Sequence, residues 1–369
     1  MPNNAYCILL EIKANKAKLL AVMIPIVLFI DHAQAIEIYN KNGTKVDLYG
    51  GMNSRREFNS DGNYDKSLVD LGFYGESKVT SDITGYGFWQ YRITGGENEW
   101  SSNGGVRQQF AGLKMVNVGS LDYGRNYGVL YDVERYTDIA PYFSGDTWTN
   151  ASDNFMVSRG DGMLTYRNED FFGKLSGLDF GLQYQAKREG YDPDKENGEG
   201  YGYSLSYQIA QGLTLTGAYS NSRRTQKQNT LESEGEKYAE AWGIGGLYTS
   251  DHLYLASVYS ETRNLTPINK SWADYKTADK TQNMEFVLQY QFDNGLRPSI
   301  SYVQSKVKDK TAGNFDMAEY IQAGVLYKLT ANVQLWFDHR FSLVNEDSEL
   351  VNYRIIDDDR SAAGVIFMF

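Results

Sequence analysis

The sequence predicts an all-β protein, a 16-stranded antiparallel transmembrane β-barrel. Three observations predict this fold: apolar and polar residues alternate along most of the chain, tight turns alternate with long polar stretches, and the strands run near ten residues. A tilted strand needs about 9–11 residues to cross a hydrocarbon layer. The 369 residues include 29 Tyr, 17 Phe and 6 Trp. These are enough aromatic side chains for the two interfacial girdles of such a barrel.

The first 35 residues are predicted to be a signal peptide. Three lysines precede the apolar run "LLAVMIPIVLFI" at 19–30, and Ala33-Gln34-Ala35 supplies an A-x-A cleavage site. The run is shorter than the roughly twenty residues that a spanning helix needs. We therefore expect the mature chain to begin at Ile36 and residues 36–369 to form a single barrel domain.

The composition excludes several classes of protein. The whole chain has 36 basic and 47 acidic side chains. The leader holds three of the basic and two of the acidic ones, so the mature chain keeps 33 basic and 45 acidic side chains, a net charge of −12. Such an acidic protein is a poor candidate for nucleic acid. The single cysteine, Cys7, leaves with the leader, so the exported protein has no disulfide. His252 and His339 stand alone, so we expect no enzyme, no metal site and no cofactor.

The turns give the strand count. Residues 284–292 alternate, turn at Asp293-Asn294-Gly295 and resume the alternation at 296–302, which predicts a hairpin. Each long stretch has a strand on either side, so eight of them make sixteen strands. The tight turns are placed at Asn42-Gly43, Ser81-Asp82, Asn117-Val118-Gly119, Ser176-Gly177, Gln211-Gly212, Ser250-Asp251, Asp293-Asn294-Gly295 and Thr330-Ala331-Asn332. The long stretches lie near residues 54–66, 94–106, 128–160, 188–200, 221–240, 262–282, 305–318 and 343–360.

A soluble β-sandwich would also alternate, but its strands have a mode of about 5–6 residues. The polar phase of the strands, with residues such as Gln183, Gln289 and Asp338, suits a water-filled lumen, so the apolar phase must face lipid. Short turns then lie on the periplasmic side and long loops on the extracellular side. The final strand, which ends at Phe369, can pair with the opening "IEIY" segment and close the sheet.

Several stretches resemble the trimeric general diffusion porins of Gram-negative outer membranes, of the osmoporin type. The resemblance covers essentially the whole mature chain in order, and it implies a homotrimer in the outer membrane that passes ions and small hydrophilic solutes by passive diffusion. It also implies contacts with lipopolysaccharide and outer-membrane lipids, and recognition of Phe369 by the barrel-assembly machinery. The matching stretches are "IEIYNKNGTKVDLYG" (36–50), "FAGLKMVNVGSLDYGRNYGVLYDV" (110–133), "TYRNEDFFG" (165–173), "QYQFDNGLRPSISYVQSK" (289–306) and the terminal Phe369.

Residues 128–160 form the longest loop, here called the constriction loop. A loop of this length without a strand pattern is usually functional. In the porin family this third loop folds into the barrel, and its carboxylates face basic residues on the wall, which filters solutes by size and charge. The resemblance assigns Asp138 to the loop acids, and Arg107 and Arg159 to the wall. The residues alone leave open a solvated Asp138 and arginines away from the constriction.

Three positions depart from the family pattern. Tyr142 follows the loop proline where the family usually has Glu, Asp70 stands where it usually has Arg, and Gly51 where it usually has Lys. The wall thereby loses two cations and gains an anion, while the loop loses one anion. We predict a stronger cation preference and a weaker transverse field than in typical relatives, with Arg55 or Arg56 facing the lumen.

Aromatic residues gather near the expected constriction, at Tyr127, Tyr131, Tyr142 and Phe143. They either pin the loop to the wall by packing or stack on a sugar. The second reading would fit a substrate-specific sugar channel, which is the nearest alternative to a general pore.

The resemblance assigns two further roles. Asp146 is expected to anchor the loop by accepting hydrogen bonds, and Arg125 is expected to bind a second-loop acid, Glu97 or Glu99, of a neighbouring subunit. An adhesive or receptor role for the exposed loops is compatible with a pore, and the sequence does not address it.

Overall fold

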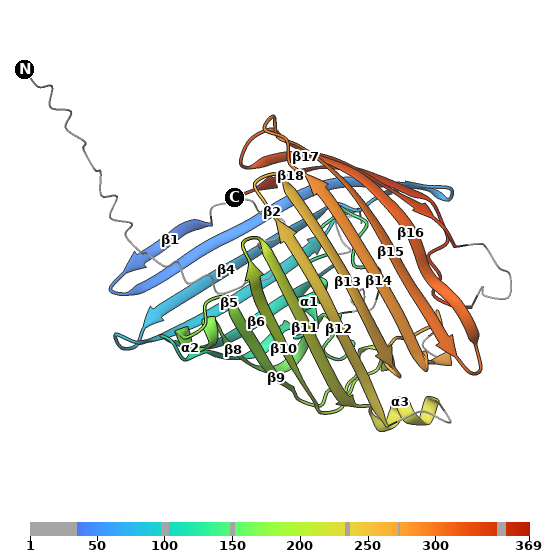
Figure 1. Cartoon of the computed structure of the whole chain (residues 1–369), viewed down its shortest axis with the longest axis horizontal. Coiled ribbons are helices and arrows are strands. Elements are labelled where there is room, and N and C mark those ends of the chain that lie inside the picture. The colour runs from blue at the N-terminus through green and yellow to red at the C-terminus, as the bar shows by residue number, and fades with distance from the viewer. Residues whose placement is uncertain (1–34, 97–102, 148–151, 233–236, 272–273, 345–351) are drawn as a thin grey trace, which may run out of the picture.

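The computed structural model describes residues 35–96, 103–147, 152–232, 237–271, 274–344 and 352–369. They form one closed antiparallel β-barrel whose strands follow one another in chain order around the wall (Figure 1). Nearly all of the expected leader, residues 1–34, lies outside the described part. The strands are β1 (Ile36–Lys41), β2 (Thr44–Asn59), β3 (Gly62–Asp65), β4 (Leu68–Lys78), β5 (Ile83–Thr94), β6 (Asn103–Met115), β7 (Gly119–Tyr127), β8 (Arg159–Asn168), β9 (Leu178–Gln185), β10 (Gly200–Ala210), β11 (Leu213–Arg223), β12 (Tyr238–Thr249), β13 (Leu253–Arg263), β14 (Lys280–Tyr290), β15 (Leu296–Asp309), β16 (Gly313–Lys328), β17 (Val333–Ser342) and β18 (Arg360–Met368).

Eighteen strands occupy sixteen positions around the barrel. β1 and β18 lie end to end along β2, and so do β3 and β4 on its other side. The prediction of a 16-stranded antiparallel barrel is therefore confirmed. The expected pairing of the final strand with "IEIY" is wrong, because Asn42 and Gly43, with φ of 55° and 76°, fold β1 back onto β2. β18 instead closes the sheet against β2, where the backbone N–H of Phe369 donates to the carbonyl of Gly50 at 3.0 Å.

Two of the expected long loops are short. β2 runs to Asn59 before β3 begins at Gly62, and β15 runs to Asp309 before β16 begins at Gly313. The polar residues at 54–66 and 305–318 therefore belong mostly to strands. Their backbone ladder continues beyond the apolar belt because it depends on main-chain hydrogen bonds and not on apolar side chains.

The helical segments are short and lie in connections. They are α1 (Tyr131–Glu134), α2 (Asp170–Gly173), α3 (Gln226–Leu231) and the 3₁₀ turn η2 (Pro193–Lys195). The predicted tight turn at Ser176-Gly177 is longer than expected, because α2 and its flanking residues fill the connection between β8 and β9. In the described part of the chain, no helix is long and apolar enough to span a membrane.

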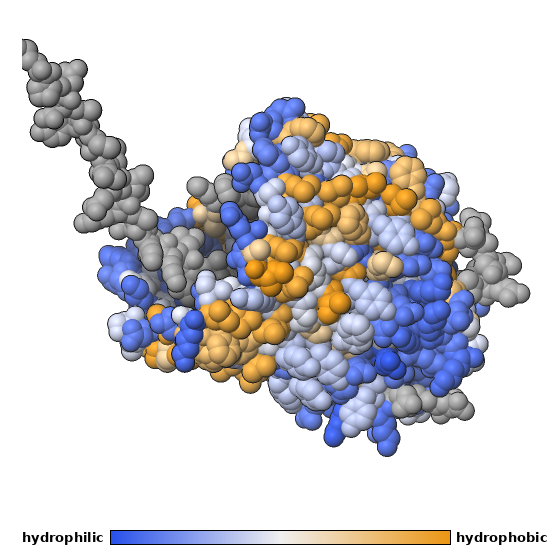
Figure 2. Space-filling view, viewed as in Figure 1, coloured by the Kyte–Doolittle hydropathy of each residue, from blue (hydrophilic) through white to orange (hydrophobic). Residues whose placement is uncertain are grey.

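The strand alternation separates an outer apolar face from a polar lumen. Along β14, Met284, Phe286 and Leu288 are exposed on the outer face, whereas Glu285 and Gln289 are buried on the inner one. Figure 2 shows apolar side chains across the middle of the wall and hydrophilic side chains gathered toward the end that carries α3. An apolar outer belt around polar interior positions is the arrangement of a barrel that spans a membrane.

Candidate functional site

The constriction loop folds into the barrel, as predicted, and packs against the inner wall. Leu130 and Val133 of its first turn are fully buried in a cluster with Ala218, Ala241 and other small wall residues of β11–β13. Gly245 leaves room for this contact, since a Cβ there would lie 3.1 Å from both the Val133 and the Tyr136 side chains. The wall is therefore shaped to receive the loop.

Polar contacts tie the base of the loop to β8–β10. The backbone N–H of Val129 donates to the Gln183 Oε1 at 3.0 Å. The Asp132 carboxylate accepts from Arg167 at 2.8 Å and from the Ser204 hydroxyl at 2.6 Å. Because these partners belong to three neighbouring strands, they fix the direction in which the loop enters the lumen.

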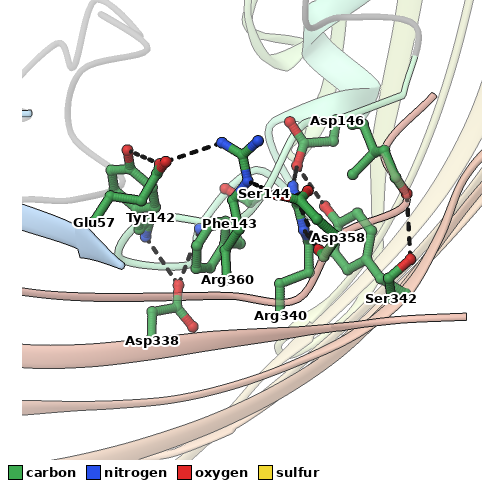
Figure 3. A network of polar contacts seen from close by, with 12 residues as sticks. Glu57, Tyr142, Phe143, Ser144, Asp146, Asp338, Arg340, Ser342, Asp358 and Arg360 are labelled. Carbon is green, nitrogen blue, oxygen red and sulfur yellow. Dashed lines mark hydrogen bonds and ion pairs between the residues drawn. The ribbon is translucent and has the colours of Figure 1, made fainter. Parts of the chain in front are cut away.

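The tip of the loop is held by one wall carboxylate. The Asp338 Oδ2 on β17 accepts the backbone N–H groups of Tyr142 and Phe143, each at 3.0 Å (Figure 3). The other oxygen, Oδ1, accepts from the Gln322 amide of the adjacent strand. Hydrogen bonds to a charged acceptor are about twice as strong as neutral ones, so Asp338 is a strong anchor.

Asp146 makes a second contact with the wall. Its Oδ2 accepts from the Tyr320 hydroxyl at 3.0 Å and lies 3.6 Å from the Arg340 guanidinium, which also binds Asp358 at 2.7 Å (Figure 3). Burial raises the pKa of the Asp146 carboxyl above its ordinary value, although the charge of Arg340 opposes the shift. These contacts join the loop to β16 and β17.

Tyr142 stands where the family usually has Glu, and it binds a carboxylate of the barrel wall. Its hydroxyl donates to the Glu57 Oε2 of β2 at 2.6 Å, and Glu57 is paired with Arg360 at 2.9 Å. The Arg55 guanidinium lies 4.6 Å from the centre of the Tyr142 ring. Arg55 is thus the lumen-facing member of its pair, whereas Arg56 is exposed on the outer face.

Asp138 is connected through two tyrosines to Arg159 on β8 of the wall. Its carboxylate accepts from the Tyr131 hydroxyl at 2.7 Å and from the Ser144 hydroxyl at 2.8 Å. The Tyr131 ring stacks on Tyr127 with centroids 4.2 Å apart, and the Tyr127 hydroxyl accepts from Arg159 at 2.9 Å. The loop acid and the wall cation therefore lie in one continuous set of contacts.

The same aromatic residues have little free ring surface. Tyr127, Tyr131 and Phe143 are 6%, 7% and 4% exposed. Phe143 packs edge-on against Tyr142 at 4.7 Å, and Tyr142 stacks on Trp336 at 5.9 Å. These contacts favour pinning of the loop over stacking on a sugar.

Arg107 stands at a β-bulge. Gln90 of β5 pairs with Gln108, but the next residue, Tyr91, pairs with Val106, so Arg107 is the extra residue of β6. A bulge commonly re-aims a side chain next to a functional site. Within the described ranges Arg107 has no hydrogen bond or ion pair, and its charged neighbours are Arg159, Arg92 and Asp70.

Asp70 lies directly between Gly51 and Arg92 in the sheet. Arg92, which sequence reasoning missed, binds Asp70 through Nε at 2.7 Å and Nη2 at 2.5 Å. The signal that could have found it is a charged residue in the lumen phase of the strand that follows Asp70. A side chain at Gly51 would be crowded, since a Cβ there would lie 2.9 Å from the Phe367 carbonyl oxygen.

Arg125 has partners within its own subunit. Its guanidinium binds Asp153 at 2.5 Å and lies 3.3 Å from Asp161. Burial alone would raise the pKa of Asp153, but Arg125 and Arg188 hold it below its ordinary value. The expected partners from a neighbouring subunit, Glu97 and Glu99, lie outside the described residues.

The described part of the chain contains no group of three or more His, Cys, Asp and Glu side chains placed to hold a metal ion. Arg55 of β2 lies over the ring of Tyr142, Arg159 of β8 donates to Tyr127, and Arg340 of β17 lies beside Asp146.

Known proteins share both the sequence and the fold. A family model described as Gram-negative porin matches residues 41–369. Outer membrane porin F of Salmonella typhimurium (strain SL1344) is 47% identical over 364 residues, 96% of this chain and 99% of that protein. Outer membrane porin N of Escherichia coli (strain K12) is 42% identical over 379 residues, 96% of this chain and 100% of that protein.

Solved structures agree with these matches. Salmonella typhi OmpF in complex with daunomycin has a TM-score of 0.84 and 46% identity, covering 90% of this chain and 100% of that one. An anion-selective porin from Comamonas acidovorans has a TM-score of 0.66 and 13% identity over 88% of this chain and 100% of that one, a likeness of fold alone. The family match over nearly all of residues 36–369, with the inward-folded loop, shows that this chain belongs to the Gram-negative porins, outer-membrane channels and not enzymes.

Proposed function

We propose that the protein forms a homotrimeric, water-filled channel for passive diffusion of ions and small hydrophilic solutes, with a preference for cations. The observation that carries the channel is the constriction loop, which lies inside the barrel and is held there by Asp338 and Asp146. A loop anchored on the inner wall narrows the lumen without closing the barrel. Solutes are then selected by size and by the charges at the narrowing.

The preference for cations is supported by the charge balance. Acidic side chains outnumber basic ones, 47 to 36 in the whole chain. Asp70 and Gly51 stand at wall positions where the family usually has cations. Low-dielectric walls focus the field of such charges and raise the local concentration of counter-ions.

A salt gradient across a planar bilayer tests both parts of the proposal. We expect current steps in groups of three equal levels. We also expect a reversal potential whose sign is that of a cation-selective channel. An inert bilayer would contradict the channel itself. A channel with the reversal potential of an anion-selective pore would contradict only the cation preference.

We further propose that Arg125 takes part in a latch between subunits, with Glu97 or Glu99 of the neighbour as its partner. Replacing both acids with glutamine is expected to lower the temperature at which the trimer dissociates by several degrees, because an interfacial charge pair is lost. Heating of detergent-solubilised trimers before electrophoresis measures this. Glu189→Gln, which removes the exposed partner of Lys187 in another loop, is the matched control. Equal temperatures for all three proteins would rule out the latch.

Two partners complete the proposal. The apolar outer belt and its aromatic residues would contact outer-membrane lipids and lipopolysaccharide. The barrel-assembly machinery would recognise the C-terminal Phe369, whose backbone closes the barrel against Gly50. Deletion of Phe369 is expected to reduce the amount of folded trimer in the outer membrane, and an unchanged amount would exclude this role.

A further inference from the structure

Three lumen-facing positions form a row across β2, β4 and β5. Gly51 lies opposite Asp70, and Asp70 lies opposite Arg92. Two nitrogens of the Arg92 guanidinium, Nε and Nη2, donate to the two carboxylate oxygens of Asp70 at 2.7 and 2.5 Å. Such a bidentate pair fixes both side chains in one geometry.

The pair belongs to the lumen wall. On β5, Phe88 and Gln90 are buried on the lumen side, whereas Ile93 is exposed on the outer face, which places Arg92 in the lumen phase. On β4, the exposed Phe73 marks the outer phase and leaves Asp70 in the inner one. The side chains of Arg92 and Asp70 are 30% and 22% exposed, so ions in the lumen can sense both charges.

The charges of the pair also act on a neighbouring arginine, Arg107. Asp70 and Arg92 both interact electrostatically with Arg107, and Arg107 has no ion-pair partner in the described part of the chain. If Arg92 did not hold it, the Asp70 carboxylate would be free to attract Arg107. The field in this part of the lumen therefore depends on which arginine Asp70 binds.

We propose that Arg92 is a specificity-determining residue of the channel for inorganic ions. Arg92 cancels the charge of Asp70 and leaves Arg107 unpaired, so the ion selectivity depends on Arg92 as strongly as on Asp70 and with the opposite sign. The inference rests on the proposed function, because selectivity exists only in a conducting pore. It predicts that removing either charge alone shifts the selectivity, in opposite directions, and that removing both charges restores it.

The test is a set of reversal potentials for Asp70→Asn, Arg92→Gln and the double variant in planar bilayers at low salt. Asp70→Asn should shift the cation-to-anion permeability ratio toward anions by about twofold, the order expected for one charge about 10 Å away in water. Arg92→Gln should shift it toward cations by a similar factor. The double variant should return close to the starting ratio, and all shifts should shrink at about 1 M salt, where the Debye length is about 3 Å.

Control variants separate this role from a structural one. Lys187→Gln and Glu189→Gln each remove one member of an ion pair whose side chains are 52% and 55% exposed. Both variants should leave the cation-to-anion permeability ratio unchanged. Arg92→Lys keeps the charge and should keep the ratio even though the fork is lost. The exchange variant with Asp70→Arg and Arg92→Asp should also keep it.

Three outcomes would overturn the inference. They are a selectivity unaffected by Arg92→Gln, a double variant that resembles Asp70→Asn alone, and a loss of channels in every variant of the pair while the unmodified protein conducts. An unmodified protein that forms no channel would instead refute the proposed function. The two failures are therefore distinguishable in one experiment.

Discussion

Replacing Asp338 with alanine is expected to free the tip of the constriction loop and widen the pore. The change leaves the backbone N–H groups of Tyr142 and Phe143 without their acceptor, and Phe143 is 4% exposed. An unsatisfied buried donor costs about 1–3 kcal/mol, so two of them favour a loop conformation in which water reaches the tip. Liposome swelling should then show faster entry of sugars that are too large for the unmodified pore. The rate should rise about tenfold if the inward-folded conformation of the loop loses ~1.4 kcal/mol of stability.

Asp338→Asn is the matched control, because an asparagine oxygen can still accept from the loop. It should keep most of the size limit while removing one negative charge from the wall. Sugar entry that is equal in the alanine variant and in the unmodified protein would show that Asp338 does not hold the tip.

Replacing Arg340 with methionine is expected to destabilise the folded barrel. Arg340 is 5% exposed, pairs with Asp146 and Asp358, and lies 5.1 Å from the ring centre of Phe143. Removing one partner of a buried ion pair costs about 3–5 kcal/mol, because the remaining charge stays buried. Urea unfolding in detergent or lipid measures the loss, and Arg340→Lys should lose less because it keeps the charge.

The loss in Arg340→Met should depend on pH with a defined sign. Burial already raises the pKa of Asp146, and Arg340 opposes that shift, so its removal raises the pKa further. The folded protein then binds a proton more readily than the unfolded chain, whose ordinary Asp pKa is near 3.8. The destabilisation should therefore shrink as the pH falls toward that value. A loss that is constant between neutral pH and pH 4 would exclude Asp146 as the uncompensated charge.

Local sequence patterns predicted the wall of the barrel well. The hairpin turns at 293–295 and 330–332 and the period-two alternation depend only on neighbouring residues, and the structure contains both. The pairing of the final strand was wrong because alternation does not identify the partner strand. The loops at 54–66 and 305–318 were too long because polar residues also form strands above the apolar belt.

The residues of the constriction could be predicted where a position of this chain matches the family pattern. The resemblance pointed to Asp138, Arg107 and Arg159, and the structure places them in or near one set of lumen contacts. Glu57 and Arg92 were missed. Their partners lie on other strands or on the loop, as in the contact between Tyr142 and Glu57, which are 85 residues apart in sequence. Strand register sets such pairs, and no local pattern reports it.

The sequence did carry one unused signal for Arg107. In "VRQQF" three polar residues follow one another, which breaks the alternation of β6. Such a break indicates a bulge, and the register of β5 with β6 places the extra residue there.

The most direct test of an inward-folded loop in a conducting lumen is chemical modification of Ser144→Cys in single channels. The only native cysteine, Cys7, lies in the expected leader, and Ser144 is half-buried beside Asp138. A cationic thiol reagent should reduce the current in up to three steps, whereas Ser81→Cys, in an exposed short turn, should be labelled with little change in current. A Ser144→Cys channel that is fully labelled and conducts as before would contradict the account.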